Sequence, residues 1–288
     1  MIEILMNTFN GDKYLSEQLN SIFAQYYKDY HLTIVDNSST DNTVKIINNY
    51  IIKYPERITL LINTNPTIDC FHLLLKNCCA EYITFFGHDD VWKKDKLLTQ
   101  IRLLKQLEET NSKDTPLLVH SDMEIVNQYL VTIQKSYFRF KNQLTEPRLE
   151  NLLIENSINI NTCMFNKALL KYSNKIPEKN INFEWWLSLI ASSFGEIVFI
   201  EEPLTMLRQL AASGENKKTE KTSLFNTYEQ ANLFLEIFSE DLPINKFKIV
   251  SDYAVFSIRS KIYRVASIIS KGYRKKTLIE ILGQIVSC

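Results

Sequence analysis

The chain has 288 residues, enough for one large domain or two modest ones, and 45% of them are hydrophobic, as in ordinary soluble globular proteins. Lysine plus arginine equals aspartate plus glutamate, at 33 each, so the charge balance gives no reason to expect a nucleic acid as partner. Glycine is scarce, and the sequence has neither a Gly-x-Gly-x-x-Gly motif nor a Walker-type loop, which argues against a glycine-rich phosphate cradle.

The cysteines and the N-terminus point to a cytoplasmic location. The five cysteines lack zinc-finger spacing, so we expect reduced, mostly buried thiols. No signal peptide is expected, because strand-like residues begin at Ile2 and the charged residues Asp12 and Lys13 follow soon after. No apolar run approaches the ~20 residues that a membrane span needs.

The first half of the chain alternates short apolar runs with helical periodicity. Strands are expected at Ile2–Met6, His31–Val35, Ile58–Ile62 and Tyr82–Phe86. Helices are expected at Asp12–Tyr26, Val44–Ile51, Cys70–Cys78 and from Trp92 to about Glu109. This repeated strand–helix order predicts an α/β fold in which helices cover both faces of a mostly parallel sheet.

The second half continues less regularly. Strands are expected at Leu117–His120, Asn161–Phe165 and within Ile197–Leu207, and helices at Arg148–Glu155 and Phe183–Phe194. Ser121 and Asp122 are expected at the carboxyl end of their strand. Basic and aromatic residues are interleaved from Lys135 to Lys141, which indicates either an acceptor contact or a solvated loop.

The last part of the chain is expected to be a helical extension. Residues Ser213–Thr222 read as an exposed loop, and helical segments are expected from Ser223 to the end. Basic residues cluster between Arg259 and Lys276 beside apolar stripes. They indicate either helices packed on the domain or a basic amphipathic surface that contacts the inner face of the plasma membrane.

Tyr82–Trp92 is the stretch most suggestive of chemistry. Five apolar, aromatic or β-branched residues suit a strand buried on both faces, and Gly87, His88, Asp89 and Asp90 follow at its carboxyl end, where open α/β sheets bind ligands. Adjacent carboxylates repel each other unless a positive charge is near, which favours a divalent cation carrying a phosphorylated ligand. The alternative is that the two aspartates cap a helix that starts near Lys93.

Several segments, in order, resemble family 2 glycosyltransferases with a GT-A fold, and in particular bacterial rhamnosyltransferase-like members. The matching segments are Thr8–Leu15, Val35–Thr43, Gly87–Trp92, and Phe183–Trp186 followed by Glu202–Leu204 and Leu207–Gln209. The resemblance covers roughly residues 2–210. It implies a GT-A domain at 1–212, with a nucleotide-sugar-binding half at 1–115 and an acceptor half at 116–212, before the helical region at 213–288.

The resemblance also implies roles for individual residues. Asp36 matches the carboxylate that accepts from the nucleotide base, Asp89 and Asp90 match the ligands of a Mg or Mn ion, and Glu184 matches the catalytic base. Arg208 matches a residue on the diphosphate side. The implied substrate-binding set is Thr8, Asn10, Asp36, Asn37, Asp69, His88, Trp185 and Arg208.

Inverting transfer needs a base on the acceptor hydroxyl and a stabilised nucleoside diphosphate as leaving group. Trp185 and Trp186 either wall the site or belong to the core. The chain departs from the family pattern at Gly87, which replaces the first aspartate of the metal motif, and at Leu210, where relatives have a histidine. Metal binding then depends more on Asp89 and Asp90, with His88 as a ligand or a cap.

The expected function is therefore inverting sugar transfer from a nucleoside-diphosphate-sugar, such as dTDP-rhamnose or a UDP-hexose, to a glycan or lipid-linked glycan acceptor in bacterial surface polysaccharide assembly. A degenerate, non-catalytic GT-A domain that binds a nucleotide-sugar or a partner enzyme stays open, although Glu184, Asp89 and Arg208 together argue against it. A nucleotidyltransferase is the other class, but such enzymes usually have a glycine-rich basic loop where this chain has Asn7–Tyr14.

Overall fold

The computed structural model describes residues 1–65, 70–76, 78–87, 89–145, 147–176, 182–209, 230–238 and 241–242. The chain divides into two compact units, Met1–Ile237 and Phe238–Cys288, and nearly all described residues belong to the first. The domain boundary expected at residue 212 and the basic C-terminal helices lie outside the described residues and stay predictions. None of the described helices is long and apolar enough to cross a membrane.

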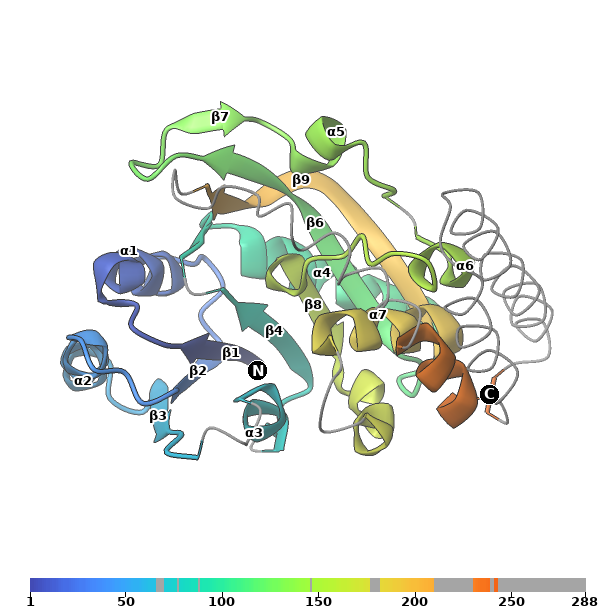
Figure 1. Ribbon diagram of the computed structural model, residues 1–288, viewed down its shortest axis with the longest axis horizontal. Coiled ribbons are helices and arrows are strands. Elements are labelled where there is room, and N and C mark those ends of the chain that lie inside the picture. The colour runs from blue at the N-terminus through green and yellow to red at the C-terminus, as the bar shows by residue number, and fades with distance from the viewer. Residues whose placement is uncertain are drawn as a thin grey trace, which may run out of the picture. The chain divides into compact units, whose positions relative to one another are not determined.

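The N-terminal half forms the predicted parallel sheet. Its strands β1 (Ile2–Thr8), β2 (Tyr30–Asp36), β3 (Ile58–Ile62) and β4 (Tyr82–Phe86) lie in the order β3-β2-β1-β4, and every neighbouring pair is parallel. The connecting helices are α1 (Asp12–Phe23), α2 (Thr43–Lys53) and α3 (Cys70–Lys76). Figure 1 shows α1 and α2 on one side of these strands and α3 on the other.

Both faces of this sheet are covered, which explains the continuous apolar strands. Successive side chains of a strand point to opposite faces. Ile4 and Met6 therefore belong to the core shared with α1, α2 and α4 (Lys96–Thr110). Phe85 points the other way and contacts Phe71 of α3 and Phe183 of α7 (Phe183–Phe194).

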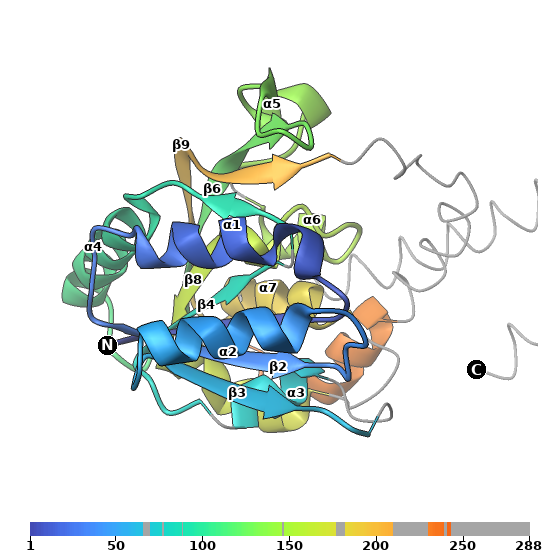
Figure 2. The same ribbon diagram turned by 90° about the vertical axis from the view of Figure 1, so that its left-hand side faces the viewer.

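The second half extends the same sheet with mixed pairing. Strand β8 (Cys163–Asn166) runs antiparallel to both β4 and β6 (Leu117–Val126), and β9 (Glu196–Arg208) runs parallel to β6. The short strand β5 (Val91–Trp92) pairs antiparallel with β9. Within the described residues the sheet thus has nine strands, in the order β3-β2-β1-β4-β8-β6-β9-β5, with β7 (Thr132–Gln134) on β6 (Figures 1 and 2).

Two boundary predictions were wrong. Strand β6 does not end at His120 but continues to Val126, so Ser121 and Asp122 lie inside it at a shift in register against β9. Helix α4 begins at Lys96 with Asp95 in the N-cap position, because the chain after Asp90 first forms β5. Asp89 and Asp90 therefore do not cap this helix.

The remaining described elements are short. They are α5 (Tyr137–Lys141), α6 (Leu149–Leu152), the 3-10 helices η1 (Ile160–Thr162) and η2 (Lys167–Lys175), and a helix at residues 230–238. Helix α7 has the predicted bounds, with Asn182 as an N-cap whose side chain accepts from the Trp185 backbone N–H. Among the described cysteines, 70 and 163 are buried, 78 is half-buried and 79 is exposed, so the burial expected for most of them holds for two.

Candidate active site

The parallel strands β1, β2 and β4 end at the same edge of the sheet, and the loops that follow them form the candidate site. The loops after β1 and β2 are bonded to each other: Asn37 N donates to Thr8 O at 2.9 Å, and Asn10 N donates to Ser39 Oγ at 2.9 Å. The Oδ1 atom of Asn10 accepts from Thr40 N at 2.9 Å. The structure thus brings together Thr8, Asn10 and Asn37, which the sequence assigned to one nucleotide pocket.

Asp36 is fully buried at the end of β2 and shapes the loop behind it. Its carboxylate accepts from Ser39 N at 2.9 Å and from Ser39 Oγ at 2.5 Å. These bonds accompany a left-handed backbone at Ser38, with φ of 59°. Thr8 Oγ1 is buried without a hydrogen-bond partner in the described part of the chain, and so is Oδ1 of the preceding residue Asn7.

Asp89 and Asp90 follow β4 but lie in different surroundings. Asp89 is partly exposed, whereas Asp90 is 1% exposed and accepts from Asn161 Nδ2 at 3.3 Å. Burial, and then the charge of Asp89, raise the pKa of Asp90 to about 7. The Oδ1 atom of Asp90 has no partner among the described residues, and a buried carboxylate oxygen of this kind is costly unless a cation or donor reaches it.

Gly87 is the residue that departs from the family pattern, and the structure gives a steric reason for it. A Cβ atom at this position would lie 2.5 Å from Asn161 Nδ2 and 2.8 Å from Asp90 Oδ2. The Gly87 carbonyl accepts from the buried Gln18 Nε2 at 3.0 Å. Asn161 therefore occupies the space that a side chain at position 87 would need.

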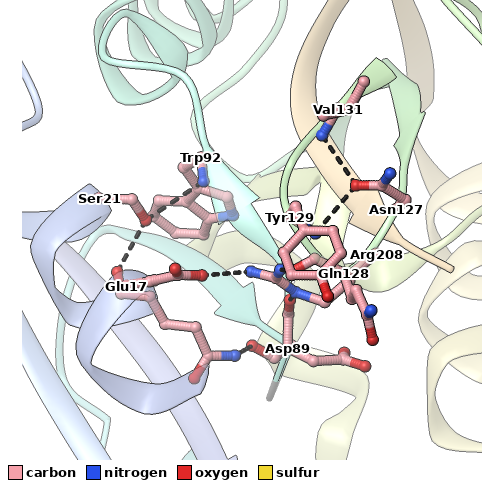
Figure 3. A network of polar contacts seen from close by, with 11 residues as sticks. Glu17, Ser21, Asp89, Trp92, Asn127, Gln128, Tyr129, Val131 and Arg208 are labelled. Carbon is pink, nitrogen blue, oxygen red and sulfur yellow. Dashed lines mark hydrogen bonds and ion pairs between the residues drawn. The ribbon is translucent and has the colours of Figure 1, made fainter. Parts of the chain in front are cut away.

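Arg208, at the end of β9, is buried and its guanidinium faces protein groups (Figure 3). Its Nε donates to the Asp89 carbonyl at 3.0 Å, and its two terminal nitrogens bond the Gln128 carbonyl and Glu17 Oε2 at 2.6 Å each. The guanidinium carbon also lies 4.3 Å from the centre of the Tyr14 ring. These contacts join α1, the loop after β4 and the β6–β7 turn.

Glu184 lies in the first turn of α7 and is half-buried. Burial raises the pKa of its carboxyl group, and a backbone hydrogen bond from Ile160 opposes that rise. The sequence could not decide between the helix dipole, which keeps the group ionised, and burial, which raises its pKa; in the structure the net direction is upward. A raised pKa suits a carboxylate that has to take a proton.

The short helix η1 links the two acidic groups. Its residue Asn161 donates to Asp90, and the preceding residue Ile160 bonds Glu184 through its backbone. Asn161 could not be picked out from the sequence, because Asn156 and Asn159 lie in the same stretch and nothing distinguishes the three. The contact arises only where β8 inserts beside β4.

Trp185 supports the core rather than the site surface. It is 3% exposed, and its indole Nε1 donates to the Leu152 carbonyl of α6 at 2.5 Å. Trp186 is fully buried and packs edge-on against Phe234. The geometry therefore favours core packing, one of the two alternatives that the sequence left open, for both tryptophans.

Asp122, which was expected at the end of its strand, uses its carboxylate for contacts within the fold. It is 4% exposed and accepts from Ser136 Oγ at 2.5 Å, Met123 N at 2.7 Å and Phe138 N at 3.1 Å. The neighbouring His120 packs against Phe138 and Phe199, and burial lowers the pKa of its imidazole to about 4. These groups fix α5 to β6.

The described residues contain no group of three or more histidine, cysteine, aspartate or glutamate side chains arranged to hold a metal. Asp89 and Asp90 are nevertheless compatible with an ion that shares its coordination with phosphates, since Mg²⁺ often takes one or two carboxylates plus substrate oxygens. The unpartnered Oδ1 of Asp90 is the observation that fits such an ion. Asp69, His88 and Leu210 lie outside the described residues.

Comparison with known proteins gives consistent results. A model of glycosyl transferase family 2 matches residues 3–167. An uncharacterised glycosyltransferase of Rickettsia prowazekii is 26% identical over 89% of this chain and 79% of its own length. The dTDP-rhamnosyl transferase RfbG of Shigella flexneri is 37% identical, over 34% of this chain and 36% of its own length.

Two solved structures share the fold. TarS of S. aureus in complex with UDP-GlcNAc superposes with a TM-score of 0.63 at 19% identity, over 88% of this chain and 71% of that one. A mannosyltransferase from Pyrobaculum calidifontis in complex with GDP-Man and Mn²⁺ has a TM-score of 0.56 at 14% identity, over 99% of this chain and 80% of that one. At such identities the likeness concerns the fold.

Proposed function

Since the chain belongs to glycosyl transferase family 2 and is a glycosyltransferase, we propose that it transfers a sugar with inversion from a nucleoside-diphosphate-sugar to a glycan or lipid-linked glycan acceptor in bacterial surface polysaccharide assembly. The proposal rests on the contacts that the short helix η1 makes with two acidic residues. Adjacent residues of this turn contact Asp90, beside the expected diphosphate site, and Glu184, the expected base. A donor-side group and a base connected by one turn suit a displacement that needs both.

The donor nucleotide is assigned to the loops after β1 and β2. Thr8, Asn10, Asp36 and Asn37 come from these loops, and the unpartnered Thr8 Oγ1 is free to bond a ligand within this part of the chain. Asp36 acts in this proposal by fixing the loop through Ser39 as well as by facing the base. The names of the relatives support a nucleotide-sugar donor such as dTDP-rhamnose or a UDP-hexose.

Glu184 is assigned the role of general base. It takes the proton of the acceptor hydroxyl as the hydroxyl oxygen bonds the anomeric carbon and the bond from that carbon to the diphosphate breaks. Asp89 and Asp90 would hold a Mg²⁺ or Mn²⁺ ion beside the diphosphate. When bound, such an ion offsets the charge that develops on the leaving group.

Arg208 is proposed to act as a positioning residue. Its guanidinium already bonds the Asp89 carbonyl, the Gln128 carbonyl and Glu17, so it orients the backbone of Asp89 instead of reaching the diphosphate directly. A planar guanidinium suits this role, because it can bond several acceptors in fixed directions. Lysine at this position would keep the charge but could not make the three contacts together.

The test is a panel of nucleotide-sugars, measured for binding and turnover with and without Mn²⁺. Sugar transfer or donor hydrolysis that Glu184→Gln lowers, while donor affinity is kept, supports the proposal. The matched control is Glu201→Gln, which removes an exposed carboxylate from β9. Donor binding without any turnover by the wild-type chain would instead favour the non-catalytic alternative.

A further inference from the structure

Exposed apolar side chains gather on the β6–β7 hairpin and α5. Of the eleven large hydrophobic side chains that are exposed among the described residues, five lie within the stretch from Tyr129 to Leu144. Figure 1 shows β7 and α5 together at the top of the view, above β6 and β9, and Figure 2 also shows α5 at the top. We call the following residues the hairpin surface: Tyr129, Val131, Ile133, Lys135, Arg139, Phe140 and Leu144.

The exposure of these side chains is large for apolar groups. Tyr129 is 77% exposed and Val131 is 60% exposed, while Ile133, Phe140 and Leu144 are each at least half exposed. Val131 and Ile133 are two residues apart, so they share one face of the hairpin. Exposed apolar side chains concentrated in one segment are typical of an interaction site.

The hairpin surface is presented by ordered structure. Asp122 holds the start of α5 through Ser136 Oγ and Phe138 N, and the buried Phe138 ring packs against Phe199. In the turn, Asn127 Oδ1 accepts from the backbone N–H groups of Tyr129 and Val131. The exposed side chains therefore project from an anchored base.

The charge of this segment has one sign. Residues 127–145 contain three basic residues and no acidic residue. Lys135 and Arg139 are both exposed; Lys135 precedes the N-cap Ser136, and Arg139 lies in the first turn of α5. The exposed carboxylates of Glu201 and Glu202 belong to β9, at the register shift opposite Asp122, which is the base of the protrusion and not its tip.

We propose that the hairpin surface binds the surface of an anionic lipid bilayer. Aromatic and aliphatic side chains are favourable at the headgroup boundary, and each basic residue near an anionic surface strengthens binding about fivefold. A soluble anionic glycan would account for the basic residues but not for five exposed apolar ones. Basic and apolar side chains together on one protrusion favour a bilayer over a soluble anion.

The hairpin surface is also connected to the candidate active site by a chain of contacts; the role inferred from this connection rests on the proposed function. Tyr129 follows Gln128, whose carbonyl bonds Arg208, which in turn bonds Asp89 (Figure 3). A bilayer against this hairpin would lie beside the donor site, where a lipid-linked acceptor could enter. Binding to lipid itself does not depend on the reaction.

The experiment measures co-sedimentation of the full chain with phosphatidylcholine vesicles, with and without phosphatidylglycerol, at low and high salt. Lys135→Gln combined with Arg139→Gln is expected to weaken binding to the anionic vesicles roughly 30-fold at low salt. Ile133→Ser combined with Phe140→Ser is expected to remove the binding that persists at high salt. The matched control is Lys45→Gln with Ile52→Ser, which changes an exposed lysine and an exposed isoleucine of α2.

All variants are first compared with the wild type by circular dichroism and thermal unfolding, so that a folding defect is not read as lost binding. Absence of binding to anionic vesicles overturns the proposal. So does binding that survives both hairpin pairs and disappears with Lys275→Gln and Lys276→Gln, because the C-terminal basic residues would then bind the lipid. Turnover of the wild-type chain with a soluble acceptor reports on the proposed function separately, because that assay contains no lipid.

Discussion

Gly87→Ala tests how tightly the loop after β4 is packed. The new Cβ would lie 2.5 Å from Asn161 Nδ2 and 2.8 Å from Asp90 Oδ2, whereas ordinary contact begins at 3.4 Å. Asn161 would have to retreat by about 0.9 Å, and its bond to Asp90 is already 3.3 Å long. We therefore expect the substitution to break that bond.

The expected cost follows from two contributions. Overpacking a buried site by one methyl group costs about 1–3 kcal/mol. Loss of a hydrogen bond to a buried carboxyl group costs about 1–3 kcal/mol more. We expect the free energy of unfolding to fall by roughly 2–6 kcal/mol, together with weaker metal-dependent donor binding, because Asp90 is one of the two proposed ligands.

A double-mutant cycle with Asn161→Ala is the sharp form of the test, measured by urea denaturation. Asn161→Ala removes the nearest clashing atom, so adding Gly87→Ala in that background should cost at least about 1 kcal/mol less than in the wild type. Gly11→Ala is the milder comparison, since its Cβ would be 3.0 Å from Thr8 Oγ1. Equal costs of Gly87→Ala in both backgrounds would refute the steric explanation.

Four further outcomes are expected. Glu184→Gln should lower turnover by roughly 10²–10⁴-fold with donor affinity nearly unchanged; loss of donor affinity with turnover retained at saturating donor would make it a donor ligand. Arg208→Lys should reduce turnover and metal-dependent donor affinity. Glu17→Gln should have the same effects more weakly, and the double variant should lose less than the sum of the two. If Arg208 instead contacted the diphosphate directly and nothing else, Glu17→Gln would have no effect. Burial lowers the pKa of His120 to about 4 in the folded protein, so its imidazole is neutral there, whereas in the unfolded chain it takes up a proton below about pH 6.5. The free energy of unfolding should therefore be highest above pH 6.5 and fall by up to about 1.4 kcal/mol per pH unit as the pH drops toward 4. Denaturation curves of His120→Leu should show a smaller slope. Trp185→Phe should lower the unfolding free energy by about 1–3 kcal/mol, because the Leu152 carbonyl loses its donor; an unchanged midpoint would contradict this.

The N-terminal half of the fold was predictable because its elements repeat simple periods. Tyr82–Phe86 has aromatic or aliphatic side chains on both faces, which is typical of a strand covered on both sides, and the structure buries all five residues. Helix α7 was predicted with its correct bounds because an asparagine cap precedes the apolar run and a glycine follows it. Local signals of this kind do not depend on the rest of the chain.

The mixed pairing of the second half was less predictable. Antiparallel β8 is only four residues long, and nothing in its composition indicates whether it pairs with β4, β6 or both. The true length of β6 was hidden by Ser121 and Asp122, which look like a strand end but mark a register shift inside the strand. A polar pair within an otherwise apolar run is also what a β-bulge produces.

The site shows the same limit at the level of single side chains. An arginine or aspartate at a strand end can face a ligand or another part of the chain, and the two cases have identical sequence patterns. Arg208 faces another part of the chain, since its ion-pair partner Glu17 is 191 residues away in the sequence. Asp122 also faces another part of the chain, where it accepts from Ser136. A buried charge needs a partner wherever the fold supplies one. Whether such a residue can act on a ligand therefore depends on how many of its hydrogen bonds are already made within the protein. The Oδ1 atom of Asp90, buried without a partner in the described chain, can still accept a hydrogen bond or bind a cation.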